Sequence, residues 1–419
     1  MNSPAPPTSK WAGDAMQARL RRRYAAERRF RWFGFGAVAL SVGFLLFLLV
    51  NMAAAGLSGF SQTRIAVPVD FRGSGLSINL DRMTREQAQS TLAQQGLPDL
   101  LTLSATAAFG PEGEHYLGAA AGAVARDAIL GDPSMLSRQV IIDLPAASAI
   151  DVAAKGAGDA VSEAAVARLD AQGKLSSGFD TLFLSGADAT DPTLAGVWGA
   201  LKGSLLTMLV TMLFAFPIGT FTAVYLEEYA PKNRLTDIIE VSINNLAAVP
   251  SIIFGLLALA LFINMFGLCG GSPLVGGMTL ALMTMPVIVI AARNAIKAVP
   301  PSIRDAALAV GASKVQVVFH HVLPLALPGI LTGAIIGMAR ALGETAPLLL
   351  IGMRAFVGDA PAGLCDRATV LPMQIFLWSD EVDKGFVENT SAAIIVLLIV
   401  LLSMNAIAIT LRNKFEQRW

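Results

Sequence analysis

The sequence predicts an all-α polytopic membrane protein with six transmembrane helices and a small α+β insertion after the first of them. The mean hydropathy is +0.60, with 54% hydrophobic and 15% charged residues among 419, which is typical of membrane proteins and excludes a water-soluble globule. Six apolar runs are long enough to cross a bilayer, which takes roughly 20 residues. Basic residues flank the ends that this topology places inside, in agreement with the positive-inside rule.

Residues 1–32 form a basic segment with eight Lys/Arg and two acidic residues, followed by the first apolar run at 33–56. A basic block could bind nucleic acid, but directly before an apolar run it is better explained as a cytoplasmic topology anchor. A cleaved signal peptide is the alternative, because the run ends in small residues such as Ala55 and Gly56. The run exceeds the usual apolar length of about 7 to 15 residues in signal peptides, so we expect a retained helix.

Residues 57–196 carry nine Lys/Arg and sixteen Asp/Glu, an excess of acid that fits the translocated, periplasmic side. Apolar residues alternate from Ser61 to Phe71, which predicts a strand, and a second strand is predicted near Ile141. Thr84 and Gln87 have the spacing of a capping box before a short helix. We therefore expect a small α+β domain, and no pattern in it indicates catalysis.

The remaining five membrane helices are expected in residues 197–412, with a short cytoplasmic tail at 413–419. Their apolar runs lie at 203–226, 247–267, 274–293, 325–352 and 391–411. The positive-inside rule places both termini in the cytoplasm. Glu227 and Glu228, at the inner end of the second helix, are most simply expected to be solvated.

The inner loop at 294–324 contains DAALAVGASKVQVVFHHVLP, an amphipathic stretch interrupted by glycine. Small residues allow close approach to another protein, and a glycine permits a turn between two short helices. The candidate contact residues are Asp305, Ala306, Ala307, Gly311, Leu323 and Pro324. An ordinary amphipathic linker helix ending at proline is the alternative explanation.

This stretch resembles the EAA loop of ABC importer permeases, which docks on a separate ATPase. ARALGETAPLLL, from Ala339 to Leu350, is similar to the phosphate-uptake permeases of the PstA type. The stretches Pro217–Leu235, Val249–Leu257 and Leu371–Phe376 extend this resemblance over residues 200–412. Three features depart from the family pattern: Asp305 replaces the usual glutamate, His321 stands where the EAA pattern has an aliphatic residue, and shorter relatives lack the insertion.

The resemblance implies a type I ABC importer permease fold in a bacterial inner membrane. It also implies four kinds of partner: a second permease of the PstC type, two ATPase subunits, a periplasmic phosphate-binding protein and the lipid bilayer. ATP and Mg would be bound by the ATPase and not by this chain, which has no phosphate-binding GxxxxGK[ST] loop. The chain would therefore be a non-catalytic subunit, and no nucleic acid is implied.

Charged residues within the fifth apolar run are candidates for translocation or gating. Glycines at 329, 333 and 337 share a helix face with Arg340 and Glu344 at about 100° per residue, and Thr345 follows in the GETAP stretch. Such a glycine face should pack against protein. Arg340 and Glu344 could form a purely structural ion pair, or Arg340 could contact an oxyanion through its fork of donors.

Cys269 and Cys365 both fall in short outer loops, where disulfides persist, so a bridge between them is predicted. Two unpaired thiols are the alternative. The three histidines are scattered and predict no metal site.

Three other functions remain to be weighed against phosphate import. An importer of the same build for sulfate or molybdate is the nearest. A membrane sensor would need a cytoplasmic output domain, and no inner loop exceeds about 40 residues, a span far below the size of an ordinary domain. A secondary transporter would not need the ATPase-docking loop.

Overall fold

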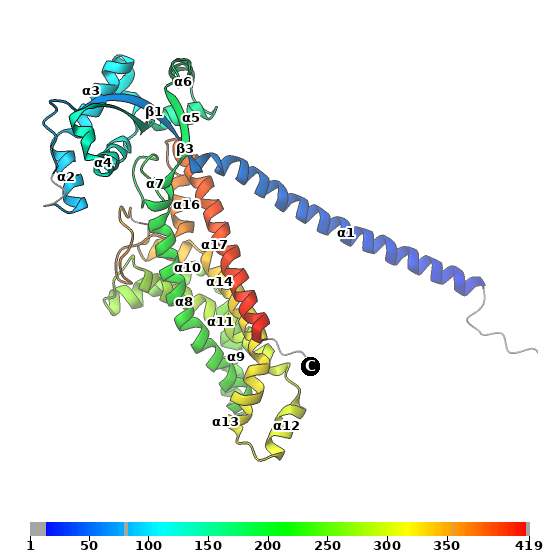
Figure 1. The fold of residues 1–419 in the computed structure, drawn as a ribbon. Coiled ribbons are helices and arrows are strands. Elements are labelled where there is room, and N and C mark those ends of the chain that lie inside the picture. The colour runs from blue at the N-terminus through cyan, green and yellow to red at the C-terminus, as the bar shows by residue number, and fades with distance from the viewer. Residues whose placement is uncertain (1–13, 79–82, 355, 416–419) are drawn as a thin grey trace, which may run out of the picture. The chain divides into compact units, whose positions relative to one another are not determined.

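The computed structural model describes residues 14–78, 83–354 and 356–415, and the chain divides into two units, residues 1–54 and 55–419. Helix α1 (Asp14–Gly56) fills the described part of the first unit (Figure 1). Its apolar window has a mean hydropathy of 2.5, and Phe33 and Leu40 are among its exposed apolar side chains. These properties suit a helix that crosses a bilayer. Residues 1–13 of the predicted basic segment lie outside the described residues.

A three-stranded antiparallel sheet forms the centre of the insertion. β1 (Ser61–Asp70) lies between β2 (Gln139–Pro145) and β3 (Leu175–Phe179). The side chains of Ile65 and Val69 are fully buried, because alternate residues of a strand point to the same face. Both predicted strands are therefore confirmed.

Six helices belong to the insertion, and the first five of them contribute buried residues to the core on the sheet. They are α2 (Arg85–Gln94), α3 (Leu97–Phe109), α4 (Ala121–Gly131), α5 (Ser148–Ala154), α6 (Ala160–Ala171) and α7 (Thr181–Ser185). Thr84 and Gln87 form the predicted capping box at the start of α2. Leu92, Leu101 and Ile129 join the strand residues in one core. The α+β insertion is thus present and packed.

The rest of the second unit is a helical bundle. Its helices are α8 (Trp198–Val224), α9 (Arg234–Ala247), α10 (Ser251–Ala258), α11 (Pro273–Lys297), α12 (Pro301–Ala309), α13 (Lys314–Gln316), α14 (Leu323–Leu342), α15 (Ala346–Leu350), α16 (Leu371–Ser379) and α17 (Gly385–Phe415). Segments Tyr225–Tyr229, Leu259–Met265 and Val317–Val322 are π-helical. α11 packs against both α8 and α14. Among the described residues, five helices are long and apolar enough to span a membrane, or six if one bent pair counts as a span.

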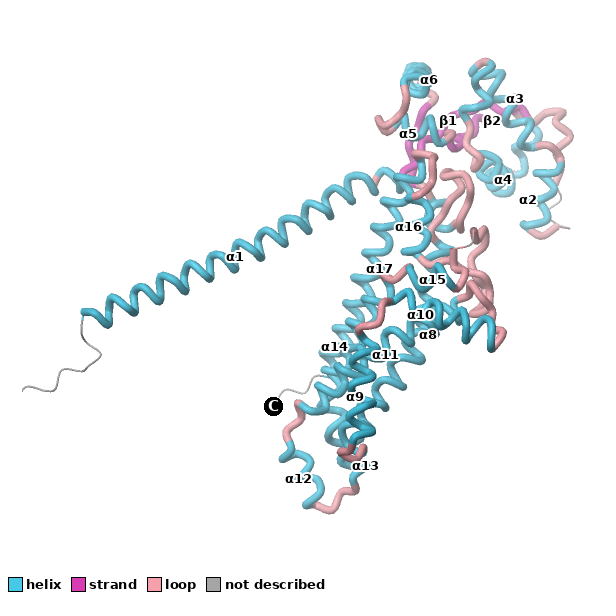
Figure 2. The backbone as a smooth tube through the Cα atoms, turned by 180° about the vertical axis from the view of Figure 1, so that it is seen from behind, coloured by secondary structure: helices cyan, strands magenta, loops and turns pink. Residues whose placement is uncertain are grey.

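The helix predicted at 247–267 is present as the segment Ser251–Met265, and α9, which was not predicted, precedes it. α9 and the segment Ser251–Met265 meet at 102° (Figure 2). α10 and its π-helical extension have eight and seven residues, which at 1.5 Å per residue reach only about 22 Å of the roughly 30 Å core. Pro250 bends the chain because the residue before a proline disfavours the α conformation.

The fifth predicted helix, at 325–352, is also interrupted. α14 ends at Leu342, and α15 begins only at Ala346 and packs beside α10 (Figure 2). Gly343 lies at the break and Pro347 follows in the first turn of α15. Both residue types oppose a continuous helix. Glu344 and Thr345 therefore lie in a connection between helices and not on the face of one long helix.

The insertion is fixed to the first turn of α17. The Lys155 ammonium donates hydrogen bonds to Asp151 and Glu388, each at 2.7 Å, and to the carbonyl of Ser61 at 2.8 Å. Ser148 of α5 donates to Asp383, just before α17, at 2.6 Å. The insertion and α12 lie at opposite ends of the bundle (Figure 1).

Candidate functional site

The loop between α11 and α14 forms two short helices that project from one end of the bundle (Figures 1 and 2). Gly311, between them, has φ +88°, a left-handed conformation that glycine adopts without Cβ strain. Ser313 and Gln316 form a capping box that starts α13. The predicted helix–glycine–helix arrangement is present. We call residues 301–322 the projecting element.

Three of the predicted contact residues face outward. Asp305, Ala306 and Gly311 are exposed, so a partner can reach them without rearrangement of the chain. An added Cβ at Gly311 would meet no atom within 4 Å. The need for glycine at this position therefore comes from its backbone conformation, not from crowding within the chain.

The other three predicted residues face inward or begin α14. Ala307 is 7% exposed and packs in a cluster with Val318 of the π-helical segment. Leu323 packs against the same cluster, and Pro324 lines a cavity of about 600 Å³ beside His320. These residues shape the projecting element and offer little surface to a partner.

Sequence reasoning missed a set of exposed apolar side chains on the same element. They are Leu308, Val310, Val315 and Phe319, with exposures of 47%, 85%, 55% and 43%. Apolar side chains on both sides of a glycine turn in a polar loop were the available signal. Several exposed apolar side chains on one short element are a feature of surfaces that bind another protein.

Glu227 and Glu228 are not solvated, contrary to the expectation from sequence. Their side chains are each 12% exposed and are ion-paired. Glu227 pairs with Arg293 of α11, and Glu228 pairs with Arg304 of α12 at 2.7 Å. Because the partners are distant in sequence, local pattern gave no signal for these pairs.

Arg340 and Glu344 lie within ion-pair distance of each other and are both partly exposed. Arg340 Nε lies 3.6 Å from Glu344 Oε1, with side-chain exposures of 42% and 22%. Glu344 lines a small cavity with Thr207, whose hydroxyl is buried and has no hydrogen-bond partner among the described residues. Thr345 accepts backbone hydrogen bonds from Leu348 and Leu349 and so begins α15.

The glycine face of α14 packs against α11, as predicted. A Cβ added at Gly333 would lie 2.2 Å from the Cβ of Ala291, and one at Gly329 would lie 2.6 Å from that of Ala295. Glycine at these two positions lets the helix backbones approach closely. Arg340 lies near the end of α14, and its side chain is exposed.

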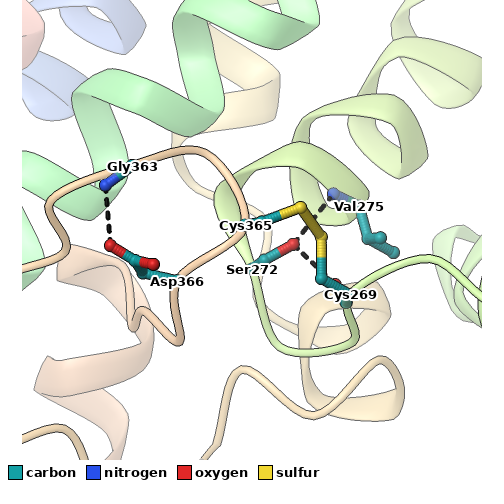
Figure 3. Close-up of a disulfide and its surroundings, with 6 residues drawn as sticks. All are labelled: Cys269, Ser272, Val275, Gly363, Cys365 and Asp366. Carbon is teal, nitrogen blue, oxygen red and sulfur yellow. Dashed lines mark hydrogen bonds between the residues drawn. A yellow bond between two sulfur atoms is a disulfide. The ribbon is translucent and has the colours of Figure 1, made fainter.

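Cys269 and Cys365 are joined in a disulfide with a Cα–Cα distance of 5.5 Å (Figure 3). Ser272 donates a hydrogen bond to the carbonyl of Cys269 at 2.6 Å, and Asp366 accepts one from the amide of Gly363 at 2.7 Å. The bridge ties the start of α11 to the segment between α15 and α16.

Two carboxylates outside the spanning segments, the half-buried Asp188 and the buried Asp180, lie near the junction of insertion and bundle. Burial raises the pKa of Asp188, although Trp378 and Gln374 donate hydrogen bonds to it. Burial also raises the pKa of Asp180, which accepts the backbone amides of Leu182 and Phe183 and caps α7. Both carboxylates have structural partners, and within the described residues no group of three His, Cys, Asp or Glu could hold a metal ion.

Two protein families match different parts of the chain. Residues 215–419 match the binding-protein-dependent transport system inner membrane component. Residues 17–164 match a domain of unknown function, DUF3333. The first helix and the insertion are thus related to proteins beyond this chain, without an assigned role.

Curated relatives and a solved structure are also similar to the chain. The probable ABC transporter permease protein YqgI of Bacillus subtilis is 37% identical over 155 residues, which are 37% of this chain and 52% of that protein. The phosphate transport system permease protein PstA 1 of Mycobacterium tuberculosis is 32% identical over 231 residues, 53% of this chain and 72% of that protein. A structure of the MetNI methionine ABC transporter aligns with a TM-score of 0.41 at 22% identity, covering 53% of this chain and 98% of that one.

The matches therefore span between 52% and 72% of these two relatives' lengths. The family match at residues 215–419 covers the half of the chain that holds the projecting element and the glycine-packed helices. On this evidence the chain belongs to the inner membrane components of binding-protein-dependent transport systems, as a permease of the PstA type.

Proposed function

We propose that this chain is a membrane subunit of an ATP-driven importer of inorganic phosphate, and that it forms half of the translocation pathway. The projecting element carries this proposal, because it presents exposed apolar side chains around a glycine turn at one end of a membrane bundle. A separate ATPase would grip this surface. The phosphate specificity is supported by the names of the PstA relatives.

The proposed assembly contains a second permease of the PstC type, two ATPase subunits and a periplasmic phosphate-binding protein. ATP and Mg would be held by the ATPase. The end of the bundle with α12, together with both chain termini, would face the cytoplasm of a bacterial inner membrane. The insertion and the disulfide would then lie on the periplasmic side, where disulfides persist.

Arg340, Glu344 and Thr345 are proposed to border the pathway or its gate. In the proposed assembly, a second permease completes the translocation pathway. The Arg340 side chain is 42% exposed, so its guanidinium is available to the space between the two permeases. Arginine suits an oxyanion because its planar fork donates two parallel hydrogen bonds.

Transport by the reconstituted complex tests this function. The chain, its co-purifying subunits and the binding protein are placed in liposomes, and uptake of radioactive phosphate, sulfate and molybdate is followed with and without internal ATP. We expect ATP-dependent uptake of phosphate alone. Uptake of sulfate or molybdate instead would assign another oxyanion, and uptake without ATP would contradict an ABC importer.

Gly311→Leu tests the coupling role of the projecting element. Leucine strains the left-handed turn, which disfavours side chains by about 1–2 kcal/mol, and places bulk at the proposed contact. Membrane insertion should persist while ATPase co-purification and phosphate uptake fall. Gly156→Leu in the insertion is the matched control, because Gly156 also follows a helix with a left-handed φ of +85° and has no atom within 4 Å of an added Cβ. Normal uptake by the Gly311 variant would reject the assignment.

A further inference from the structure

Arg304 of α12 is bound to two other helices at once. Its Nη2 donates to Glu228 Oε1 at 2.7 Å and to the carbonyl of Ile296 at 3.0 Å. Its Nε donates to Glu228 Oε1 at 3.1 Å, and its Nη1 donates to the carbonyl of Val299 at 2.7 Å. The side chains of Arg304 and Glu228 are 23% and 12% exposed. One guanidinium thus joins α12 to the ends of α8 and α11.

The chemistry of each partner fits a cation at this position. Ile296 and Val299 lie at the C-terminal end of α11, where free carbonyls and the helix dipole favour positive charge. Glu228 accepts two donors of the guanidinium fork, a geometry that lysine cannot reproduce. The site is therefore specific for arginine and not only for positive charge.

The π-helical turn at the end of α8 directs two neighbouring glutamates to different helices. Glu228 reaches α12, whereas Glu227 pairs with Arg293 of α11. Arg293 also pairs with Glu240 of α9 at 2.8 Å. π turns are rare and occur frequently at functional sites. The successive residues Glu227 and Glu228 thus carry two adjacent groups of ion pairs, which together form the network at the ends of α8, α9, α11 and α12.

Packing alone holds α12 weakly. The helix has nine residues, and Ala307 is its only buried one. A helix of this length is marginal in isolation, so its orientation depends on contacts with other elements. Most of its remaining surface is exposed and would be available to a partner.

We propose that Arg304 and Glu228 are positioning residues that clamp α12 to α8 and α11, so that movement of the projecting element is transmitted to these two membrane helices. This inference rests on the proposed function, in which an ATPase moves that element. Without the clamp, α12 could follow the ATPase while α8 and α11 stayed behind. ATP would then be hydrolysed with little transport.

The ratio of phosphate transported to ATP hydrolysed measures this transmission directly. In proteoliposomes with equal amounts of assembled complex, Arg304→Gln and Glu228→Gln should lower the ratio about tenfold, within the range of ordinary coupling energies. Arg304→Lys should lower it less, because the charge at the end of α11 is kept while the fork is lost. Lys297→Gln is the control, since Lys297 is 55% exposed and lies 3.4 Å from Glu227 at the edge of the network.

An unchanged ratio in Arg304→Gln would overturn the proposal. A parallel loss of hydrolysis, uptake and bound ATPase would also overturn it, because the residues would then serve docking. If the parent complex transports another anion, the ratio is measured with that anion, so the clamp can stand even if phosphate specificity fails.

A second measurement does not depend on transport. Spin labels at introduced cysteines replacing Val310 and Lys232, both exposed, report the distance between the projecting element and the end of α8. The distance distribution in the purified chain should be narrow in the parent and in Lys297→Gln, and broad in Arg304→Gln. A narrow distribution in all three would refute the clamp even if the transport function were wrong.

Discussion

Single glycines set the distance between α14 and α11. A Cβ added at Gly333 would lie 2.2 Å from the Cβ of Ala291, closer than two such atoms can approach. At Gly337, one turn away, the nearest atom is Cγ1 of Ile288 at 3.6 Å, which is ordinary contact. Two glycines on the same face therefore differ in what they can tolerate.

Gly333→Ala should destabilise the bundle by about 1–3 kcal/mol, the usual cost of overpacking, because α14 must move away from α11. Gly337→Ala should leave stability unchanged, and it serves as the matched control. Thermal unfolding of the purified chains in detergent measures both. Equal unfolding temperatures for the two variants would contradict the predicted close approach at Gly333.

Asp180 shows how burial changes the effect of one carboxylate on stability. Its folded-state pKa is raised by burial, so its ionisation costs stability at neutral pH, and that cost disappears as the pH falls through the raised pKa. Asp180→Asn keeps an oxygen that can accept the amides of Leu182 and Phe183. We expect this variant to be more stable than the parent at about pH 7 and to lose that advantage near pH 4.

Asp132→Asn should behave in the opposite way. Its side chain accepts hydrogen bonds from Ser134 and pairs with Arg138, and these contacts lower its pKa. The stabilising charge is present above the ordinary carboxyl pKa and is lost as the pH falls, so the variant should be less stable than the parent near neutrality. The unfolding temperatures of both variants and the parent are measured at about pH 7 and near pH 4. If both variants shift the unfolding temperature in the same direction near neutrality, the opposite pKa directions assigned to Asp180 and Asp132 are wrong.

At the scale of elements, the disulfide connects two segments that are also joined by a backbone hydrogen bond from Leu274 to the carbonyl of Leu364 at 3.0 Å. Cys269 and Cys365 are separated by 96 residues, and closing a loop of about 100 residues constrains the unfolded chain by roughly 4–5 kcal/mol in the chain-entropy model. Replacing both cysteines by serine should therefore lower the unfolding temperature of the purified chain. The parent, denatured without reductant, should take up no thiol label, and labelling of two cysteines would contradict the bridge.

Element boundaries show where sequence reasoning was sufficient and where it was not. Strand β1 was predictable because alternation over ten residues reports burial directly. The break at Gly343 was missed because the predicted apolar run at 325–352 continues across it. Hydropathy reports how apolar a segment is and does not show where a helix is interrupted or changes direction. The bend between α9 and α10 was missed for another reason: α9 is amphipathic and lies outside the predicted apolar run, although Pro250 was a visible signal.

At the scale of the whole molecule, residues brought together from distant segments could not be found from sequence. Glu228 and Arg304 are 76 residues apart, and Lys155 and Glu388 are 233 apart. Neither pair has a local pattern, because each partner lies on a different element. Family resemblance marked the projecting element, but the exposed side chains and the ion pairs around it required three-dimensional structure.

The lone chain also leaves Arg340 available to a neighbouring subunit. A buried ion pair broken on one side costs about 3–5 kcal/mol, but a pair as exposed as Arg340 and Glu344 contributes only about 0–1 kcal/mol. Arg340→Gln and Glu344→Gln should therefore fold and insert normally, with small shifts in unfolding temperature. Their effects on transport can then be read without correction for misfolding.

Uptake by the double variant, Arg340→Gln with Glu344→Gln, separates the two roles. If the residues form only a structural pair, removing both charges restores balance and uptake returns to near the parent rate. We expect instead that uptake stays low. A neutral amide cannot replace the guanidinium as a charged bidentate donor, whether Arg340 contacts the oxyanion or takes part in gating. Arg354→Gln, at an exposed position after α15, is the control for loss of an arginine alone. Rates are normalised to inserted protein, and recovery in the double variant would leave the structural pair as the explanation.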